Sequence, residues 1–281
     1  MEKAELNSNF IHLHTHSHYS LLDGLSKIPD MVKTAKKNGM NAIAVTDHGN
    51  MYGAIELYKE CQKAGIKAII GVEAYIAERG RKDKEPGVDN KRKHLTLLAK
   101  NKQGYKNLMR LVTLANLEGY YYKPRMDQEL LSKYSKGIIA TTGCPGGEIQ
   151  TRLRMGAYKE AVNAAAKMRE IFGTDNYFLE IMDHSIDIEK RVLTDLLKLG
   201  KELNLPLLAT NDLHYTHHKD AAAHEVMLCI QSGATLADPK RFKFESDGQS
   251  AKRIEIGRIR NTTGIIMESS AFEAAERTRL R

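Results

Sequence analysis

Short apolar runs alternate with longer segments of helical periodicity along most of the chain. The helical segments cover residues 28–38, 54–64, 157–172 and 188–203, and a glycine follows each of the first two. Alternation of this kind predicts a mainly parallel sheet covered by helices. The runs with the character of strands cover residues 10–14, 42–47, 68–76, 95–99, 137–142, 177–181 and 206–211.

The number of apolar runs narrows the range of possible folds. Seven strands predict an α/β barrel similar to the (β/α)8 type but with one unit fewer. An open doubly wound sheet is the alternative, although no glycine-rich turn of the kind that cradles a phosphate follows any run. The pattern stops near residue 247, and in the remainder only residues 269–279 look helical. We therefore expect a domain at 1–247 and an extension of unknown role at 248–281.

Composition is that of a globular protein, with 42% hydrophobic residues. No apolar run approaches the roughly 20 residues of a membrane span, and the first residues lack the apolar core of a secretory signal. The three cysteines are too few and too scattered for a disulfide framework, and we expect Cys61 and Cys229 to be buried as small apolar side chains. These features predict a cytoplasmic protein without a membrane partner.

Charge adds a second indication. The net charge of +8 favours acidic partners, including nucleic acid. Lysines and arginines gather at residues 79–93, a segment that also contains glycine and proline and is predicted to be a mobile basic loop. The loop either contacts phosphates or is merely solvated, and the sequence leaves both interpretations open.

A row of histidines marks the first apolar run. His12, His14, His16 and His18 alternate along the chain, and Asp23 follows shortly after. On a strand, alternate side chains share one face, so the row predicts four imidazoles pointing the same way. The alternative to a metal site is that the four histidines form a polar surface or pack in the core. Imidazole is the commonest protein ligand for zinc-like ions, and the row therefore favours a metal site.

Further metal-ligating residue types recur at or just after the later runs. In parallel α/β folds the loops that follow the strands converge at one edge of the sheet, so such residues can form one site. His94 is the exception because it begins its run, and it fits only if that strand starts earlier or runs differently. The other candidates at these positions are Asp47, His48, Glu73, Cys144, Asp212 and His214.

The size and mixture of this set suggest its chemistry. It exceeds the four ligands of a structural zinc site, and mixed histidines and carboxylates suit several ions with bridging ligands. Sites of this type cleave phosphate esters, with metal ions activating water and neutralising phosphoryl oxygens. A thiolate at Cys144 would favour zinc, whereas the oxygen ligands would admit manganese or iron.

Six stretches spread over residues 8–245 carry a family resemblance. They are HLHTHSHYSLLDGLSKI, AVTDHGNMYGAIELYKECQKAGIKAIIGVEAYIA, HLTLLAKNKQGYKNLMRLV, EGYYYKPRMD, GIIATTGCPGGEI and LLATNDLHYTHHKDAAAHEVMLCIQSGATLADPKRFKF. The chain resembles the PHP (polymerase and histidinol phosphatase) domain at the N-terminus of the bacterial replicative DNA polymerase III alpha subunit. Residues 19–24 and 118–125 look particularly like the polymerase branch, whereas residues 248–281 do not resemble the family's continuation.

The resemblance implies a distorted (β/α)7 barrel that holds three divalent metal ions, with zinc favoured and manganese or iron as alternatives. His12 and His18 are then expected at the rim or in the core, and Asp47 is expected to orient the site from behind its ligands. The implied catalytic residues are His14, His16, Asp23, His48, Glu73, Asp212 and His214, and the implied metal ligands are these seven together with His94 and Cys144.

The implied activity is removal of nucleotides from a DNA 3′ end by a 3′→5′ exonuclease that proofreads replication. Its implied partners are the DNA, the polymerase domains of a parent chain and replisome subunits. Lys91, Arg92, Lys123 and Arg125 are candidates for holding the strand, although they could equally face a polymerase domain or solvent. Two alternatives stay open: a catalytically silent, metal-stabilised scaffold that docks a proofreading subunit, and a small-molecule phosphatase similar to histidinol phosphatases.

Overall fold

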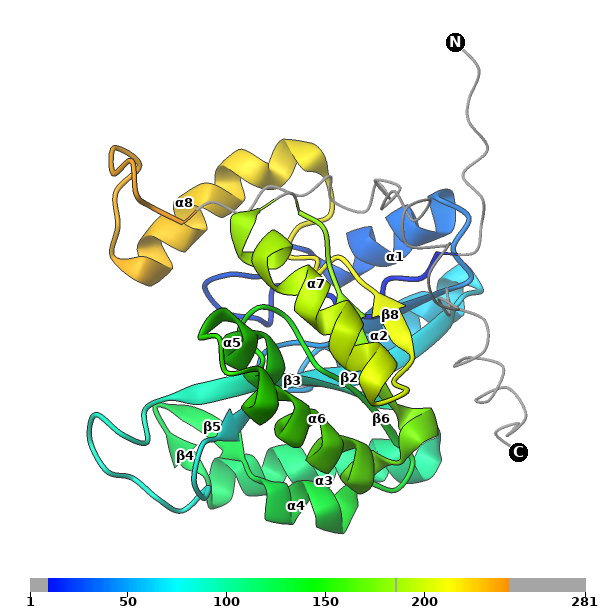
Figure 1. Ribbon diagram of the computed structural model, residues 1–281. Coiled ribbons are helices and arrows are strands. Elements are labelled where there is room, and N and C mark those ends of the chain that lie inside the picture. The colour runs from blue at the N-terminus through cyan, green and yellow to red at the C-terminus, as the bar shows by residue number, and fades with distance from the viewer. Residues whose placement is uncertain (1–9, 185, 243–281) are drawn as a thin grey trace.

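The computed structural model describes residues 10–184 and 186–242. Within them the strands are β1 (Ala42–Val45), β2 (Lys67–Ala77), β3 (Arg92–Ala99), β4 (Tyr120–Tyr121), β5 (Lys123–Met126), β6 (Ile138–Thr141), β7 (Tyr177–Ile181) and β8 (Leu207–Ala209). They form one curled sheet in the order β4-β5-β2-β3-β6-β7-β8, and β1 pairs with the first part of β2 (Figure 1). The expected extension at 248–281 lies outside the described residues.

Helices pack around this sheet. Each long helix turns a row of apolar side chains inward, as α7 does with Val192, Leu196 and Leu199. Gly65 ends α2 with a φ of 67°, a left-handed conformation that glycine adopts without strain. The helices are α1 (Ile28–Lys37), α2 (Ala54–Ala64), α3 (Lys102–Leu117), α4 (Gln128–Tyr134), α5 (Glu148–Arg154), α6 (Tyr158–Phe172), α7 (Asp187–Glu202) and α8 (Ala221–Ser232).

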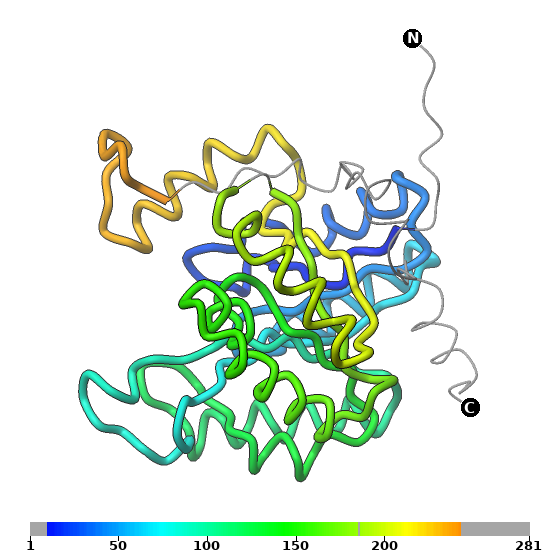
Figure 2. Tube along the Cα trace, in the orientation of Figure 1, coloured from blue at the N-terminus to red at the C-terminus, as the bar shows by residue number. Residues whose placement is uncertain are grey.

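The N-terminal segment closes the sheet into a barrel. Residues 12–16 lie between β1 and the chain that follows β8. The Ala44 amide donates to the His12 carbonyl at 2.9 Å, and the His16 amide donates to the Leu213 carbonyl at 2.7 Å. Figure 2 shows this blue segment beside the yellow one. Hydrogen bonds therefore run around the ring from β1 through β2, β3, β6, β7 and β8 and back to β1, and the predicted distorted (β/α)7 barrel is confirmed.

The structure corrects two details of the predicted sheet. Residues 10–14 do not form a strand, and the segment that closes the barrel makes only isolated bridges, such as Thr15 with Leu213. The sheet is also mixed rather than mainly parallel, because β3 runs antiparallel to both β2 and β6. A parallel neighbour needs a crossover helix, whereas β2 and β3 are joined by the loop at 78–91 without one.

The barrel interior is apolar at one end and polar at the other. Nearly every segment of the ring contributes side chains to one apolar cluster, so this cluster lies inside the barrel. It includes Leu13, Ala44, Ile69, Phe178 and Leu208. Glu180 lies two residues after Phe178 in the chain, and Thr210 lies two residues after Leu208; both are also buried. Because alternate residues of a strand share a face, the polar layer stacks directly on the apolar one.

Candidate metal centre

All nine candidate metal ligands come together at the polar end of the barrel. They arrive from every side: from the segment before α1, from the turns after β1, β6 and β8, and from β2 and β3 themselves. One flank of the group is fully buried, whereas Asp23, His48, His94 and His214 are partly exposed. The centre, as we use the term below, consists of His14, His16, Asp23, His48, Glu73, His94, Cys144, Asp212 and His214.

Glu73 lies at the middle of the centre. Its Oε2 is 2.6 Å from His48 Nδ1 and 3.5 Å from His16 Nε2. Its Oε1 is 3.6 Å from His14 Nε2. The carboxylate is 1% exposed, so it has exchanged water for imidazoles on several sides. A carboxylate in this position can bridge two cations.

Asp212 approaches from the opposite side. Its Oδ1 lies 3.3 Å from His14 Nε2 and 3.2 Å from His16 Nε2. The residue has a φ of 41°, in the left-handed region that non-glycine residues seldom adopt. Strain of this kind persists only where surrounding contacts impose it, and functional sites are where it gathers. The turn also carries His214, whose ring stacks on His16 with centroids 4.3 Å apart.

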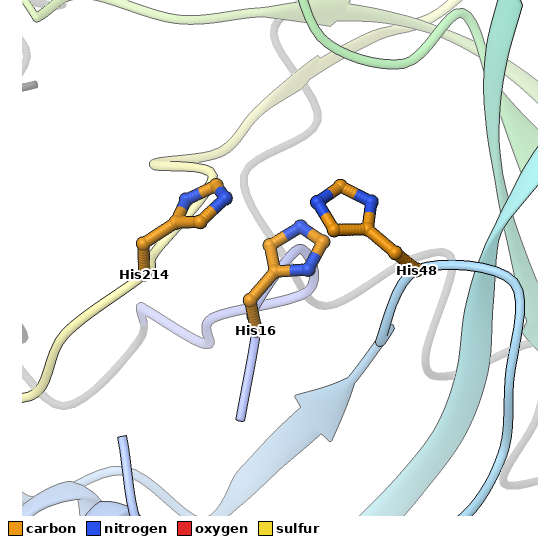
Figure 3. A group of neighbouring side chains, drawn as sticks. All are labelled: His16, His48 and His214. Carbon is orange, nitrogen blue, oxygen red and sulfur yellow. The ribbon is translucent and has the colours of Figure 1, made fainter. Parts of the chain in front are cut away.

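Asp23 and His48 form the solvent side of the centre. Asp23 Oδ2 is 3.0 Å from His48 Nε2. Helix α8 holds Asp23 in place, because His224 Nε2 donates to its backbone carbonyl at 2.8 Å and Gln231 Nε2 donates to its carboxylate at 3.0 Å. Figure 3 shows His16, His48 and His214 with their rings turned toward one another from three separate segments.

His94 and Cys144 complete the group, and the orientation of β3 explains how. His94 is near the N-terminal end of β3, which starts at Arg92, earlier than its apolar run. Because β3 is antiparallel, this end meets the carboxyl ends of its neighbours. His94 Nδ1 lies 3.0 Å from Glu73 Oε1, and the Cys144 thiol donates to the same oxygen at 3.2 Å. Gly146 permits this approach, since a Cβ there would lie 3.0 Å from His94 Nδ1.

Burial and neighbouring charged side chains strongly shift the pKa values of two histidines in the centre. Burial and the neighbouring charges of His48 and His214 lower the pKa of His16 to about 3. Burial opposes the charged form of His48 as well, but the carboxylates of Glu73 and Asp23 outweigh it and raise its pKa to about 10. Two imidazoles with ring centroids 4.2 Å apart thus have opposite shifts in pKa, which is typical of functional clusters.

The acidic groups respond to the same surroundings. Burial raises the pKa of Asp23, but the hydrogen bond and charge of His48 outweigh it and lower the pKa to about 2. Burial, followed by the negative charges of Glu73 and Asp212, raises the pKa of the Cys144 thiol well above its usual range. A bound cation would reverse the effect on Cys144, because it stabilises the thiolate.

The donor set fits divalent cations. Three overlapping triplets each place their ligand atoms within 4.8 Å of one another: His16, His48 and His214; His14, His16 and Glu73; and His48, Glu73 and His94. Within the described residues, several buried ligand atoms have no hydrogen-bond partner, which is costly unless a cation engages them. These atoms are Nε2 of His14 and His16, Nδ1 of His48, Oε2 of Glu73, and Oδ1 of Asp23 and Asp212. The short contacts among them lack the alignment of hydrogen bonds.

Two buried carboxylates stand behind the histidines. Asp47 accepts from the Ser20 hydroxyl at 2.7 Å, and that hydroxyl lies 2.9 Å from His16 Nδ1. Glu180 accepts directly from His14 Nδ1 at 2.7 Å. Asp47 was predicted from the sequence, whereas Glu180 was not. A lone glutamate inside the apolar run at 177–181 was the available signal.

The outer members of the histidine row lie apart from the centre. The ring of His12 contacts Phe10, with centroids 4.9 Å apart, and the ring of His18 contacts Tyr19 at 4.2 Å. Neither belongs to a triplet of potential ligands. His12 is fully buried, and His18 is partly exposed.

The basic residues divide into two groups. The prediction that Arg125 holds a DNA strand is wrong. Its guanidinium is wholly buried and donates to the backbone carbonyls of Arg81, Asp83, Asp89 and Gly119, so it cannot contact DNA. Nor is the loop at 78–91 simply a solvated basic segment, because its arginines are committed to carboxylates. We call Arg79, Arg81, Arg125, Asp89 and Asp127 the arginine network.

Arg92 and Lys123 belong to the other group. Their charged ends lie 5.5 Å and 5.7 Å from the ring centroid of Tyr75. The Tyr75 ring in turn packs against His48 and His94, with centroids 5.9 Å and 5.4 Å away. Both cations therefore border the solvent side of the centre, whereas Lys91 is exposed on the adjoining loop.

Comparison with known proteins agrees with this arrangement. A model of the PHP domain matches residues 12–184. The chain belongs to the PHP domain family. The matched residues include the candidate ligands from His14 to Cys144, whereas Asp212 and His214 lie beyond them.

Similar proteins place this PHP domain within longer chains. The DNA polymerase III alpha subunit of Mycobacterium tuberculosis is 50% identical over 266 residues, which cover 90% of this chain and 22% of the relative. The alpha subunit of Treponema pallidum is 47% identical, over 85% of this chain and 20% of the relative. The chain thus spans about one fifth of these relatives.

A solved amidohydrolase from Chromobacterium violaceum superimposes with a TM-score of 0.47 and 15% identity, over 73% of this chain and 87% of that one.

In the described part of the chain, no helix combines the length and apolar character needed to cross a membrane. All three cysteines are free and buried, as expected for Cys61 and Cys229.

Proposed function

We propose that this PHP domain is a metal-dependent phosphodiesterase that removes nucleotides from the 3′ end of DNA. One observation carries the proposal: nine residues of ligand type converge in a single centre, and several of its buried ligand atoms lack hydrogen-bond partners. The similarity to DNA polymerase III alpha subunits supports DNA as the substrate and replication as the setting.

The three overlapping triplets support more than one ion, and we propose three. Cys144 favours zinc, whereas the carboxylates also suit manganese or iron. Bound there, such ions would supply a deprotonated water near neutral pH and would neutralise the charge of the phosphoryl group. Glu73 and Asp212 would hold ions from the buried side, and Asp23 would do so from the solvent side.

The exposure of the residues around the centre supports one direction of substrate entry. His14, His16, Glu73 and Asp212 are buried, so a phosphodiester reaches the centre past Asp23, His48 and His94. On this side Arg92 and Lys123 stand over Tyr75 and can bind backbone phosphates of the incoming strand. No serine or cysteine nucleophile is required, because the bound ions would supply the attacking water in deprotonated form.

Cleavage of a 3′-labelled primer with added zinc or manganese tests the proposal. We expect Asp23→Asn to lower the cleavage rate about 100-fold or more, because it removes a charged ligand. Asp30→Asn is the matched control: Asp30 also pairs with a histidine, His217, at 2.8 Å, but it lies outside the centre. Equal cleavage by wild type and Asp23→Asn would refute the assigned site.

The remaining outcomes separate the other functions. Bound metal without cleavage of any phosphate ester would identify a metal-stabilised scaffold, as a brace for polymerase domains or a docking site for a proofreading subunit. Faster hydrolysis of a small phosphomonoester than of DNA would identify a phosphatase. Fewer than two ions per chain in elemental analysis would contradict the proposed three-ion centre.

A further inference from the structure

We infer that Glu180 is a positioning residue: it fixes the ring of His14 so that Nε2 faces the metal ions, and threonines of adjacent strands hold Glu180 in turn. The inference rests on the proposed metal-dependent function. It concerns a residue of β7, the one predicted strand that contributes no candidate ligand at either end.

The contacts of Glu180 are complete and wholly internal. Its Oε1 accepts from His14 Nδ1 at 2.7 Å, and both side chains have 0% exposure. The Thr210 hydroxyl donates to the same oxygen, and the Thr141 hydroxyl donates to Oε2. The Glu180 amide donates to the Thr142 hydroxyl at 2.9 Å, which fixes the backbone as well.

These contacts determine which nitrogen of His14 can bind a metal. An ionised carboxylate only accepts hydrogen bonds, so the Nδ1 facing Glu180 must carry a proton. Nε2 is then the nitrogen with a lone pair to offer a cation, and it points at Glu73 and Asp212, 3.6 Å and 3.3 Å away. Carboxylates placed behind metal-ligating histidines in this way fix the tautomer and strengthen the ligand.

Other histidines of the centre are oriented differently. The Nδ1 of His16 contacts the Ser20 hydroxyl, which donates to Asp47, so on this side of the ring the carboxylate is reached only through a hydroxyl. Both nitrogens of His48 face candidate ligands, Glu73 and Asp23. The direct, fully buried pairing makes His14 the histidine whose metal binding should depend most on a residue outside the ligand set.

A purely structural role would predict something else. If Glu180 only filled its place in the polar layer, replacing it would lower stability and leave metal affinity unchanged. Glu180→Gln has nearly the same volume, and its amide nitrogen can donate to a threonine hydroxyl, because a hydroxyl accepts as well as donates. The substitution therefore preserves packing but removes the negative charge that holds His14 and strengthens it as a ligand.

The test measures zinc affinity by competition with a chromophoric chelator. We expect Glu180→Gln to weaken zinc binding about 10- to 100-fold. Asp127→Asn, which changes a buried carboxylate that pairs with Arg81 outside the centre, should leave affinity unchanged. In a His14→Ala background, Glu180→Gln should cause no further loss, because its effect acts through His14. An unchanged affinity, or losses that simply add, would overturn the inference.

A second measurement needs no change at Glu180. In the zinc-loaded wild-type protein, histidine-labelled NMR spectra should show the His14 ring protonated at Nδ1 and not at Nε2, with the signal assigned by its loss in His14→Ala. A proton at Nε2 would overturn the inference even if Glu180→Gln failed to fold. If wild type bound no zinc at all, the proposed function would fail instead, so the two failures are distinguishable.

Discussion

The arginine network and the metal centre both bury charged side chains, but they do so in opposite ways. In the network every cation meets complementary partners: Arg81 lies 2.9 Å from Asp127 and 2.7 Å from Glu118, and Arg125 donates to four backbone carbonyls. In the centre, lone-pair atoms of several residues point at one another, and within the described residues many lack a partner.

The difference teaches how to tell structure from function in a buried polar cluster. Buried groups that satisfy one another stabilise the fold and need nothing more. Buried groups that converge without partners are explained by something that joins them, and histidines with carboxylates call for a cation. If the two regions divide in this way, substitutions in each should affect stability and metal binding differently.

The largest effect is expected in the arginine network. Arg125→Met removes the donors of four carbonyls while keeping an apolar stem, and we expect it to lower the free energy of unfolding by about 5 kcal/mol. Chemical denaturation measures the loss. Arg125→Lys should not restore it, because an ammonium cannot span the same acceptors. Zinc affinity should be unchanged, and a large change would erase the distinction between the regions.

Metal should stabilise the protein through the centre alone. At free zinc about 1,000 times above the dissociation constant, we expect about 4 kcal/mol of added stability, which a chelator removes. Glu73→Gln should abolish this gain, since Glu73 contacts ligands on several sides. Thermal denaturation with and without zinc checks both. A similar loss of the gain in Asp127→Asn would contradict the separation.

The pH dependence of the network has a definite sign. Burial raises the pKa of Asp127, but hydrogen bonds from the Arg81 and Leu130 amides and from the Arg81 guanidinium outweigh it and lower the pKa. Its stabilising contribution is therefore complete above the unfolded-state value near 3.9 and is lost as pH falls through the folded-state value. We expect Asp127→Asn to cost about 2 kcal/mol at pH 7.

The stability gap between wild type and Asp127→Asn should narrow as the solution is acidified, because the titrating group is absent from the variant. Urea denaturation at a series of pH values measures the gap. A gap that stays constant down to the most acidic folded condition would show that Asp127 acts through packing alone.

The smallest effect concerns the free cations. Within the described residues, Arg92 and Lys123 make no ion pair, so each is available to a phosphate. We expect Lys123→Ala or Arg92→Ala to weaken binding of single-stranded DNA about threefold. Each should also reduce, by about 0.7, the steepness with which the logarithm of the binding constant falls against the logarithm of the salt concentration. Arg79→Gln, which alters an arginine already paired with Asp89 at 2.5 Å, is the control. Equal effects in all three would indicate a general charge effect.

Residue type and position predicted which side chains converge, because loops after parallel strands meet at one edge of the sheet and a metal admits few ligand chemistries. The same reasoning placed His94 only conditionally, since the sequence does not reveal that β3 is antiparallel. It missed Glu180, which lies within an apolar run rather than at its end. It also misjudged Arg125, because a buried and an exposed arginine are identical as letters.

By itself, the sequence determined the barrel class, the apolar faces of the helices and the ligand types available, because these follow from local periodicity and side-chain chemistry. Only the tertiary structure decided which partners those side chains find. Closure of the barrel by residues 12–16 brings His14 against Glu180, 166 positions away, and folding of the loop at 78–91 commits its arginines to carboxylates. Such long-range pairings depend on burial and three-dimensional distance, which no local pattern encodes.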